Sequence, residues 1–221
     1  LRSGLTNILI MLAIIGVLFP IQMGPEWLVN PLGLISAAWL PLFMSMGLMA
    51  DAIAGERERH TLETLLASRL SDRAILFGKL AAACIYGLSI ALAGMLIGAL
   101  TINLQHSGAG FYPAANFLGA LIFTFLGTLL VSGLGVLVSL HASSVRQAYQ
   151  RMSLGFIILW LPLILGPQIM PEAWLVEISQ WISQFNVAQV AFLAVAALLV
   201  LDSILIGLGL VRFKRSRLIL D

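Results

Sequence analysis

The stretch Asp51-Ala-Ile-Ala-Gly-Glu-Arg-Glu-Arg-His-Thr-Leu-Glu-Thr-Leu-Leu-Ala-Ser-Arg-Leu-Ser-Asp-Arg-Ala-Ile-Leu-Phe-Gly-Lys79 decides how this chain is organised. It holds ten of the 22 Asp, Glu, Lys and Arg residues, while the sequence on both sides of it is almost entirely apolar. Charged side chains need water, whereas long apolar flanks need to leave it. We therefore expect a solvated segment between two segments that are buried in a membrane.

The composition excludes a soluble domain. Of the 221 residues 60% are hydrophobic and only 10% are charged, whereas soluble domains carry about 25% charged residues. The pI near 9.0 therefore reflects the placement of charges around a membrane and not a nucleic-acid partner. Cys84 is the only cysteine and lies in an apolar run, so we expect a buried side chain without a disulfide or a metal cluster.

Six segments are apolar and approach or exceed the roughly 20 residues that a helix needs to cross a bilayer. They are residues 5–20, 32–50, 75–100, 115–140, 152–169 and 187–211. Between them we expect a turn-rich loop with an interfacial Trp27, the charged stretch 51–79, a linker over 101–114 and a polar connection over 141–151; Pro162 and Gly166 interrupt the fifth segment. The sequence predicts an all-α membrane protein that forms one transmembrane domain over residues 1–221.

The first segment has a competing interpretation as a cleaved signal peptide. No small-x-small cleavage site follows Phe19, which argues against it. The chain begins at Leu1 and not at Met, so we expect that residues preceding it are missing.

The cations set the orientation. If six segments cross in alternation, all twelve Lys and Arg residues fall on one side of the membrane, whereas Glu26, His106, Glu172 and Glu177 fall on the other. Cytoplasmic loops are enriched in Lys and Arg. We therefore expect both termini and the charged stretch to be cytoplasmic.

A further helix is expected between the fifth and sixth segments, over residues 171–185. Its apolar residues recur at helical spacing, with Glu and Gln mostly elsewhere on the helix. They are Trp174, Leu175, Ile178, Trp181, Ile182 and Phe185. Such a segment is too short to cross and predicts an amphipathic helix at the outer interface.

Within the charged stretch, Gly55 is expected to end the second crossing helix. From Glu56 onward a helical pattern follows, with one apolar stripe made of Leu62, Leu65, Leu66 and Leu70. A break is expected over residues 68–71, and Ser71 and Asp72 are suited to cap a second helix. The alternative is a solvated loop. However, acidic residues do not help to set membrane orientation, and an apolar leucine stripe in water needs a surface to cover it. Both features favour a docking surface.

Two runs within the stretch, Glu56-Arg-Glu-Arg-His-Thr-Leu-Glu-Thr-Leu-Leu-Ala-Ser68 and Ile75-Leu-Phe-Gly-Lys79, resemble a known signature. It is that of the permease subunits of type 2 ATP-binding cassette (ABC) exporters. The order of six crossing helices with an outer helix before the last is also similar to that family. Two departures are Arg69, where the family usually has Pro, and the absence of a cytoplasmic amphipathic helix before the first crossing.

The resemblance implies a coupling helix that inserts into a separate nucleotide-binding subunit. Its residues would be Glu56, Arg57, Glu58, Arg59, Thr61, Leu62, Glu63, Leu65 and Leu66. It further implies export of a substrate from a prokaryotic cell, ATP and Mg held by the partner subunit and none by this chain, and pairing with a second copy or a homologous permease.

No catalytic motif is expected in the chain itself. Gly78-Lys79 lacks the first glycine and the Ser or Thr of a phosphate-binding loop, and His60, His106 and His141 lie in three different regions. Gly94 and Gly98 form a GxxxG pattern, which favours helix packing within the subunit over a dimer contact.

Asp202 lies mid-span in the sixth segment, where it is either a substrate or proton site or a carboxylate paired with a neighbouring polar group. The alternative function is a secondary transporter or channel that needs no ATPase, which Asp202 and Pro162 support weakly. No sequence feature indicates a membrane scaffold. An uncharged set of crossing segments favours an amphipathic or apolar cargo.

Overall fold

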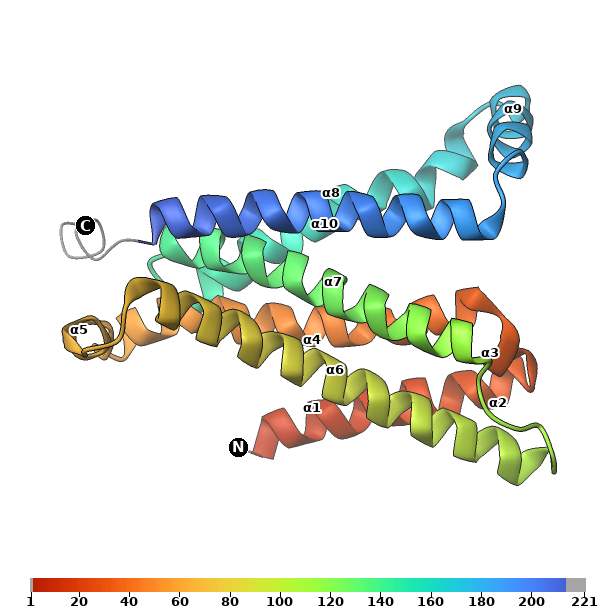
Figure 1. Cartoon of the computed structure of the whole chain (residues 1–221), viewed down its shortest axis with the longest axis horizontal. Helices are drawn as coiled ribbons and strands as arrows, with labels where there is room; N and C mark the ends of the chain where they lie inside the picture. Colours follow the sequence, from red (N-terminus) through yellow and green to blue (C-terminus); the bar gives the residue numbers. More distant parts are fainter. Residues whose placement is uncertain (1, 214–221) are drawn as a thin grey trace.

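Long helices run back and forth along one axis and are joined by short connections (Figure 1). This computed structural model describes residues 2–213. Side chains are described throughout that range except for residues 2–4, 31–40, 66, 159–160, 162–164, 167, 179, 182–183 and 187. Leu66 of the predicted coupling helix and residues 214–221 of the basic tail thus lie outside the described side chains.

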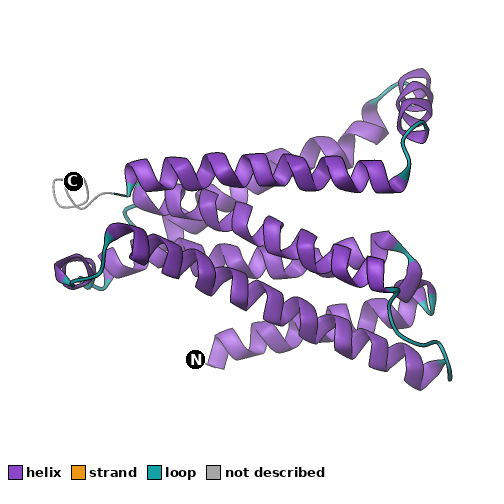
Figure 2. Cartoon of the chain, viewed as in Figure 1, coloured by secondary structure: helices purple, strands orange, loops and turns teal. Residues whose placement is uncertain are grey.

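The described residues form helices and no strand (Figure 2), which confirms the all-α prediction. In chain order they are α1 (Arg2–Ala13), a π-helical turn η1 (Ile14–Leu18), α2 (Phe19–Met23), α3 (Glu26–Val29), α4 (Pro31–Glu58), α5 (Leu62–Ala67), α6 (Asp72–Gln105), α7 (Ala114–Leu140), α8 (Val145–Ile169), α9 (Glu172–Ser183) and α10 (Val187–Arg212).

Four stretches among the described residues are long and apolar enough to cross a membrane. They are Leu5–Met23, Asp72–Gln105, Ala114–Leu140 and Ala188–Arg212. Helices α4 and α8, with 28 and 25 residues, are long enough but carry charged residues at one end. The full set of six crossings therefore stays a prediction.

Several predicted boundaries are wrong. Helix α4 does not end at Gly55 but continues to Glu58, and α8 begins at Val145, where the Ser144 hydroxyl accepts a hydrogen bond from the Gln147 N–H. The predicted polar connection over residues 141–151 therefore shrinks to four residues, and α8 runs through Pro162 and Gly166 without a break. The predicted cap of α6 is confirmed, because the Ser71 hydroxyl accepts from the Ala74 N–H.

Trp27 is not an interfacial residue, contrary to the sequence prediction. It is 0% exposed and belongs to a cluster that joins η1, α3, α6 and the α6–α7 connection. Its Nε1–H donates to the Tyr112 hydroxyl over 3.2 Å, and that hydroxyl donates to the Met95 carbonyl over 3.1 Å. Burial raises the pKa of Tyr112 to about 12, so its hydroxyl keeps the proton that this chain of hydrogen bonds needs.

Replacing Tyr112 by Phe should destabilise this end of the bundle. The change leaves the buried Trp27 N–H and the Met95 carbonyl without their common partner, which costs about 1–3 kcal/mol for an unsatisfied buried group. The measurement is thermal unfolding in lipid nanodiscs. Tyr86→Phe on α6 is the control, and an equal shift for both variants would contradict the assignment.

The first helical segment crosses α6 through close contacts at small residues. A Cβ on Gly16 would lie 2.6 Å from Ile97 Cγ2, and one on Gly94 would lie 3.1 Å from Ile15 Cγ2. Thr101 donates to the Gly16 carbonyl over 2.7 Å, within the π-helical turn. Gly98 faces Trp27 and Tyr112, so both glycines of the GxxxG pattern pack within this chain, as predicted.

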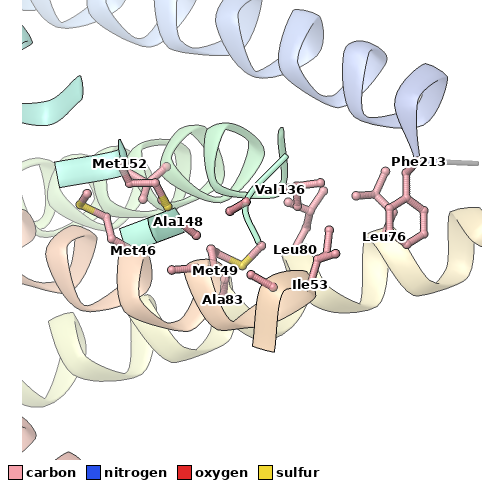
Figure 3. Packing of buried hydrophobic residues seen from close by; sticks show 14 of the residues in the cluster. Met46, Met49, Ile53, Leu76, Leu80, Ala83, Val136, Ala148, Met152 and Phe213 are labelled. Carbon is pink, nitrogen blue, oxygen red and sulfur yellow. The ribbon is translucent and has the colours of Figure 1, made fainter. Parts of the chain in front are cut away.

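The larger hydrophobic core lies toward the opposite end, where α4, α6, α7 and α8 meet and α10 ends (Figure 3). Methionines fill much of it, including Met46, Met49 and Met152. Unbranched methionine side chains fit irregular gaps between helices. This core positions the polar end of α4, which the sequence singled out.

Candidate functional site

The last turns of α4 are held by a hydroxyl group from α7. Ser139 is 0% exposed; its Oγ accepts from the N–H groups of Ala54 and Ile53 over 2.9 and 3.3 Å and donates to the Ala50 carbonyl over 3.2 Å. Ala54 N–H and Ala50 C=O are the two groups that pair with each other in a regular helix. Ser139 therefore joins α7 directly to the backbone hydrogen bonding of α4.

Three charged side chains that follow on α4 contact other helix ends. Glu56 pairs with Lys79 of α6 over 2.6 Å, and the Lys79 ammonium also donates to the Ala52 carbonyl. Arg57 donates to the carbonyl of Leu140, the last residue of α7, and to that of Ala142 just after it. We call Glu56, Arg57, Glu58 and Lys79 the α4 clamp.

Glu58 completes the α4 clamp at the start of α8. Its Oε1 accepts from the Val145 N–H over 3.0 Å, so a carboxylate meets the positive end of the α8 dipole. The Glu56–Lys79 pair is only partly exposed, with side-chain exposures of 20% and 18%. The clamp thus connects α4 to the ends of α6, α7 and α8.

Arg59 and Asp51 form a separate, exposed ion pair along α4. Two nitrogen–oxygen contacts of 3.0 Å join them, and the hydrogen bond and charge of Asp51 raise the pKa of Arg59. The pair passes over Gly55, where a Cβ would lie 2.0 Å from Asp51 Oδ1. Gly55 therefore makes room for this ion pair and does not end the helix.

The break that was expected at Gly55 falls at His60, which has a φ of 55°. This left-handed conformation ends α4. The Thr61 N–H and hydroxyl both donate hydrogen bonds to the Glu56 carbonyl. The short α5 follows and projects from one end of the bundle (Figure 1). The predicted break over residues 68–71 is present between α5 and α6.

The predicted coupling residues thus separate into two groups. Thr61 and Glu63 are exposed at α5, whereas Leu62 is only 8% exposed and joins the core together with the partly buried Leu65. Two leucines of the stripe therefore pack within this chain, whereas Leu70 is 54% exposed. Contact between the stripe and a partner stays a prediction. Glu56, Arg57 and Glu58 contact this chain's own helices, and Arg59 contacts Asp51.

Sequence reasoning missed Ser139 as a contact of α4. A serine in an apolar helix gives no periodic signal, because its partner is backbone and leaves no trace in the sequence. The role of Lys79 was also missed, although it ends the quoted signature. Its partners Ala52 and Glu56 lie on α4, more than 20 residues earlier, so no local pattern indicates the contact.

Asp202 lies inside the helix bundle and is 3% exposed. Neither carboxylate oxygen has a hydrogen-bond partner among the side chains and backbone that the structure describes. A lone carboxylate in mid-membrane costs about 3 kcal/mol to insert. The sequence left two alternatives for Asp202. The described residues provide no partner for a paired carboxylate, and the role of a substrate or proton site stays a prediction.

Helix α9 lies at the end of the bundle opposite α5 (Figure 1), and several of its apolar side chains are exposed. Trp174 and Trp181 are 60% and 61% exposed and Ile178 is 43% exposed. Trp181 and Phe185 stack edge to face with ring centroids 4.9 Å apart. The predicted amphipathic helix is present, and its apolar residues are largely uncovered by this chain.

Long apolar helices with exposed hydrophobic surfaces define a multi-pass membrane protein. Residues 32–211 match the family described as ABC-2 family transporter protein. The chain belongs to this family and is a permease-type transport subunit, which in general works with an ABC ATPase subunit and is not itself an ATPase. The comparison with curated proteins found no match.

Proposed function

We propose that this chain is the membrane permease of an ABC exporter in a prokaryotic cell membrane. A separate ATPase subunit docks at α5, and ATP hydrolysis there moves a substrate outward between this chain and a second permease, either a copy or a homologue. The observation that carries the proposal is the α4 clamp, which connects the segment next to α5 with the ends of α6, α7 and α8. Movement of α5 would therefore reach the helices around the transport path.

The proposed topology has six crossings, with α4 and α8 added to the four apolar stretches. Both termini and α5 would be cytoplasmic. Support comes from the positions of the charges: α5, the start of α8 with Arg146 and Arg151, and the end of α10 with Arg212 lie at one end of the bundle (Figure 1). Glu172 and Glu177 lie on α9 at the other end, where the exposed tryptophans suit a membrane interface.

The structure allows the docking role to be divided between residues. Exposed Glu63 and Thr61 are available to a partner, and charges at the edge of an interface set specificity and register. Glu56, Arg57, Glu58 and Lys79 would instead transmit movement, because each already contacts another helix end of this chain. Leu65, partly buried, would contribute to both.

The test is co-purification of the permease with its ATPase after Glu63→Lys. We expect the complex to be lost or weakened by about tenfold or more. A surface of the ATPase that binds Glu63 would carry basic residues, and a lysine at position 63 would repel them. Glu177→Lys, a matched reversal on α9 at the far end, should leave the complex intact. Retention of the full complex by Glu63→Lys would contradict docking at α5.

One observation favours an ATPase-independent secondary transporter or channel as the second candidate, namely the buried Asp202 without a described partner. Such transporters carry ionisable residues near the middle of the membrane. The two candidates differ in their response to inactivation of the partner. Substitution of the phosphate-binding lysine of the ATPase should abolish transport by an ABC exporter and spare a secondary transporter.

A further inference from the structure

An apolar groove of about 400 Å³ lies on the bundle between α6, α7 and α10. All of its lining residues are apolar. They include Leu88 and Leu92 of α6, Leu121 and Phe125 of α7, and Val195 and Leu199 of α10. Leu199 and Phe125 are 50% and 41% exposed, so the groove opens toward the surroundings of the bundle.

On each of the three helices, the residues that line the groove are followed on the same helix face by a buried residue, which is polar on α7 and α10. The spacings of three or four residues place successive members on one helix face. The stripes are Leu92, Leu88 and Cys84 on α6, Leu121, Phe125 and Thr128 on α7, and Val195, Leu199 and Asp202 on α10. Because α6 runs opposite to α7 and α10 (Figure 1), Cys84, Thr128 and Asp202 all lie just beyond the same end of the groove lining, nearer to α5.

All three residues are buried, and Thr128 and Asp202 carry polar atoms without a hydrogen-bond partner among the described residues. Asp202, Thr128 and Cys84 are 3%, 0% and 5% exposed. Both oxygens of Asp202 and the Thr128 hydroxyl lack hydrogen-bond partners among the described residues. With a rise of about 1.5 Å per residue, Asp202 lies only about 4.5 Å along α10 beyond Leu199.

We propose that this groove binds an amphipathic organic monocation, with its hydrophobic part against the leucines and its cationic centre at Asp202. An unpaired carboxylate in a low dielectric attracts a cation far more strongly than it would in water. A groove of this volume lies in the range of small-molecule sites. The inference rests on the permease function proposed above and names the class of molecule that the permease takes.

Neither of two other occupants would satisfy Asp202. A neutral acyl chain fills an apolar groove but offers no hydrogen-bond donor. A second copy of this chain brings no cation to this depth, since residues 80–145 and 152–211 contain no Lys or Arg. Lys79, the nearest cation along α6, is bonded to Glu56 and to the Ala52 carbonyl.

The test is equilibrium binding of radiolabelled tetraphenylphosphonium to the full chain in lipid nanodiscs. We expect saturable binding that Asp202→Asn weakens by about tenfold or more, the scale of one lost charge contact. Glu177→Gln, which removes an exposed carboxylate on α9, should leave binding unchanged. The similarly shaped anion tetraphenylborate should not compete.

A second variant keeps the carboxylate and fills the groove. Leu199→Trp should also reduce binding, and it keeps the proposal testable if Asp202→Asn does not fold. Absence of saturable binding to the unchanged chain, unchanged binding by Asp202→Asn, or equal competition by tetraphenylborate would each overturn the proposal. The measurement needs no ATPase, and Glu63→Lys should retain binding, so failure of the docking proposal is distinguishable.

Discussion

Lys79→Met should lower the unfolding temperature of the permease by about 5–10 °C, corresponding to a loss of about 2–3 kcal/mol. The physical cause is the carboxylate that remains. Glu56 Oε1 would lose its 2.6 Å contact, and its Oε2 is already buried without a partner among the described residues. A charge that is largely removed from water and has no partner destabilises more than the pair itself stabilises.

The double variant Glu56→Gln with Lys79→Met separates this cause from loss of side-chain packing. A neutral amide costs less to bury than a carboxylate, so most of the lost stability should return. Transport in reconstituted vesicles should not return with it, because the connection between α4 and α6 stays broken. Equal unfolding temperatures for the single and double variants would show that the unpaired charge is not the cause.

Gly135→Ala should force α4 and α7 apart, and Gly135→Leu should prevent folding. A Cβ at position 135 would lie 2.6 Å from Met49 Cβ and 2.9 Å from Met152 Cε. Met152 can move its flexible end, but Met49 Cβ is fixed to the backbone of α4. We expect a loss of about 1–3 kcal/mol for alanine, reduced by up to about 1 kcal/mol through its higher helix propensity.

Gly119→Ala is the matched control because it lies in the same helix. Nothing in the described structure lies within 4 Å of a Cβ at that position. The control should be neutral or up to about 1 kcal/mol more stable, since alanine favours helix over glycine. Thermal unfolding of both variants in nanodiscs gives the comparison, and shifts of the same sign and size would contradict the steric argument.

The long helices were predictable from sequence because hydropathy alone determines them. Helices α7 and α10 begin and end within a residue of the predicted segments 115–140 and 187–211. Ser71 identified the start of α6 because a serine before a helical run satisfies free backbone N–H groups. Local rules were sufficient wherever the decisive contact lay within a few residues.

Long-range contacts account for the predictions that failed. The expected helix end at Gly55 is wrong, because α4 continues to Glu58 and the Asp51–Arg59 ion pair lies next to the glycine. The expected interfacial position of Trp27 is wrong, because Tyr112, 85 residues later, completes its buried environment. The sequence predicted which segment holds the candidate site. It could not predict which residues are exposed at α5 and which belong to the α4 clamp, because the partners of the clamp lie on other helices.

The position of Ser139 limits how the permease can move. Its hydroxyl makes three hydrogen bonds to backbone groups between Ala50 and Ala54, so α7 cannot slide along α4 without breaking all of them at once in a site that excludes water. Rotation about that point stretches them far less. We therefore expect α4 and α7 to pivot about Ser139, with small displacements near α5 becoming larger ones at the distant ends of the two helices.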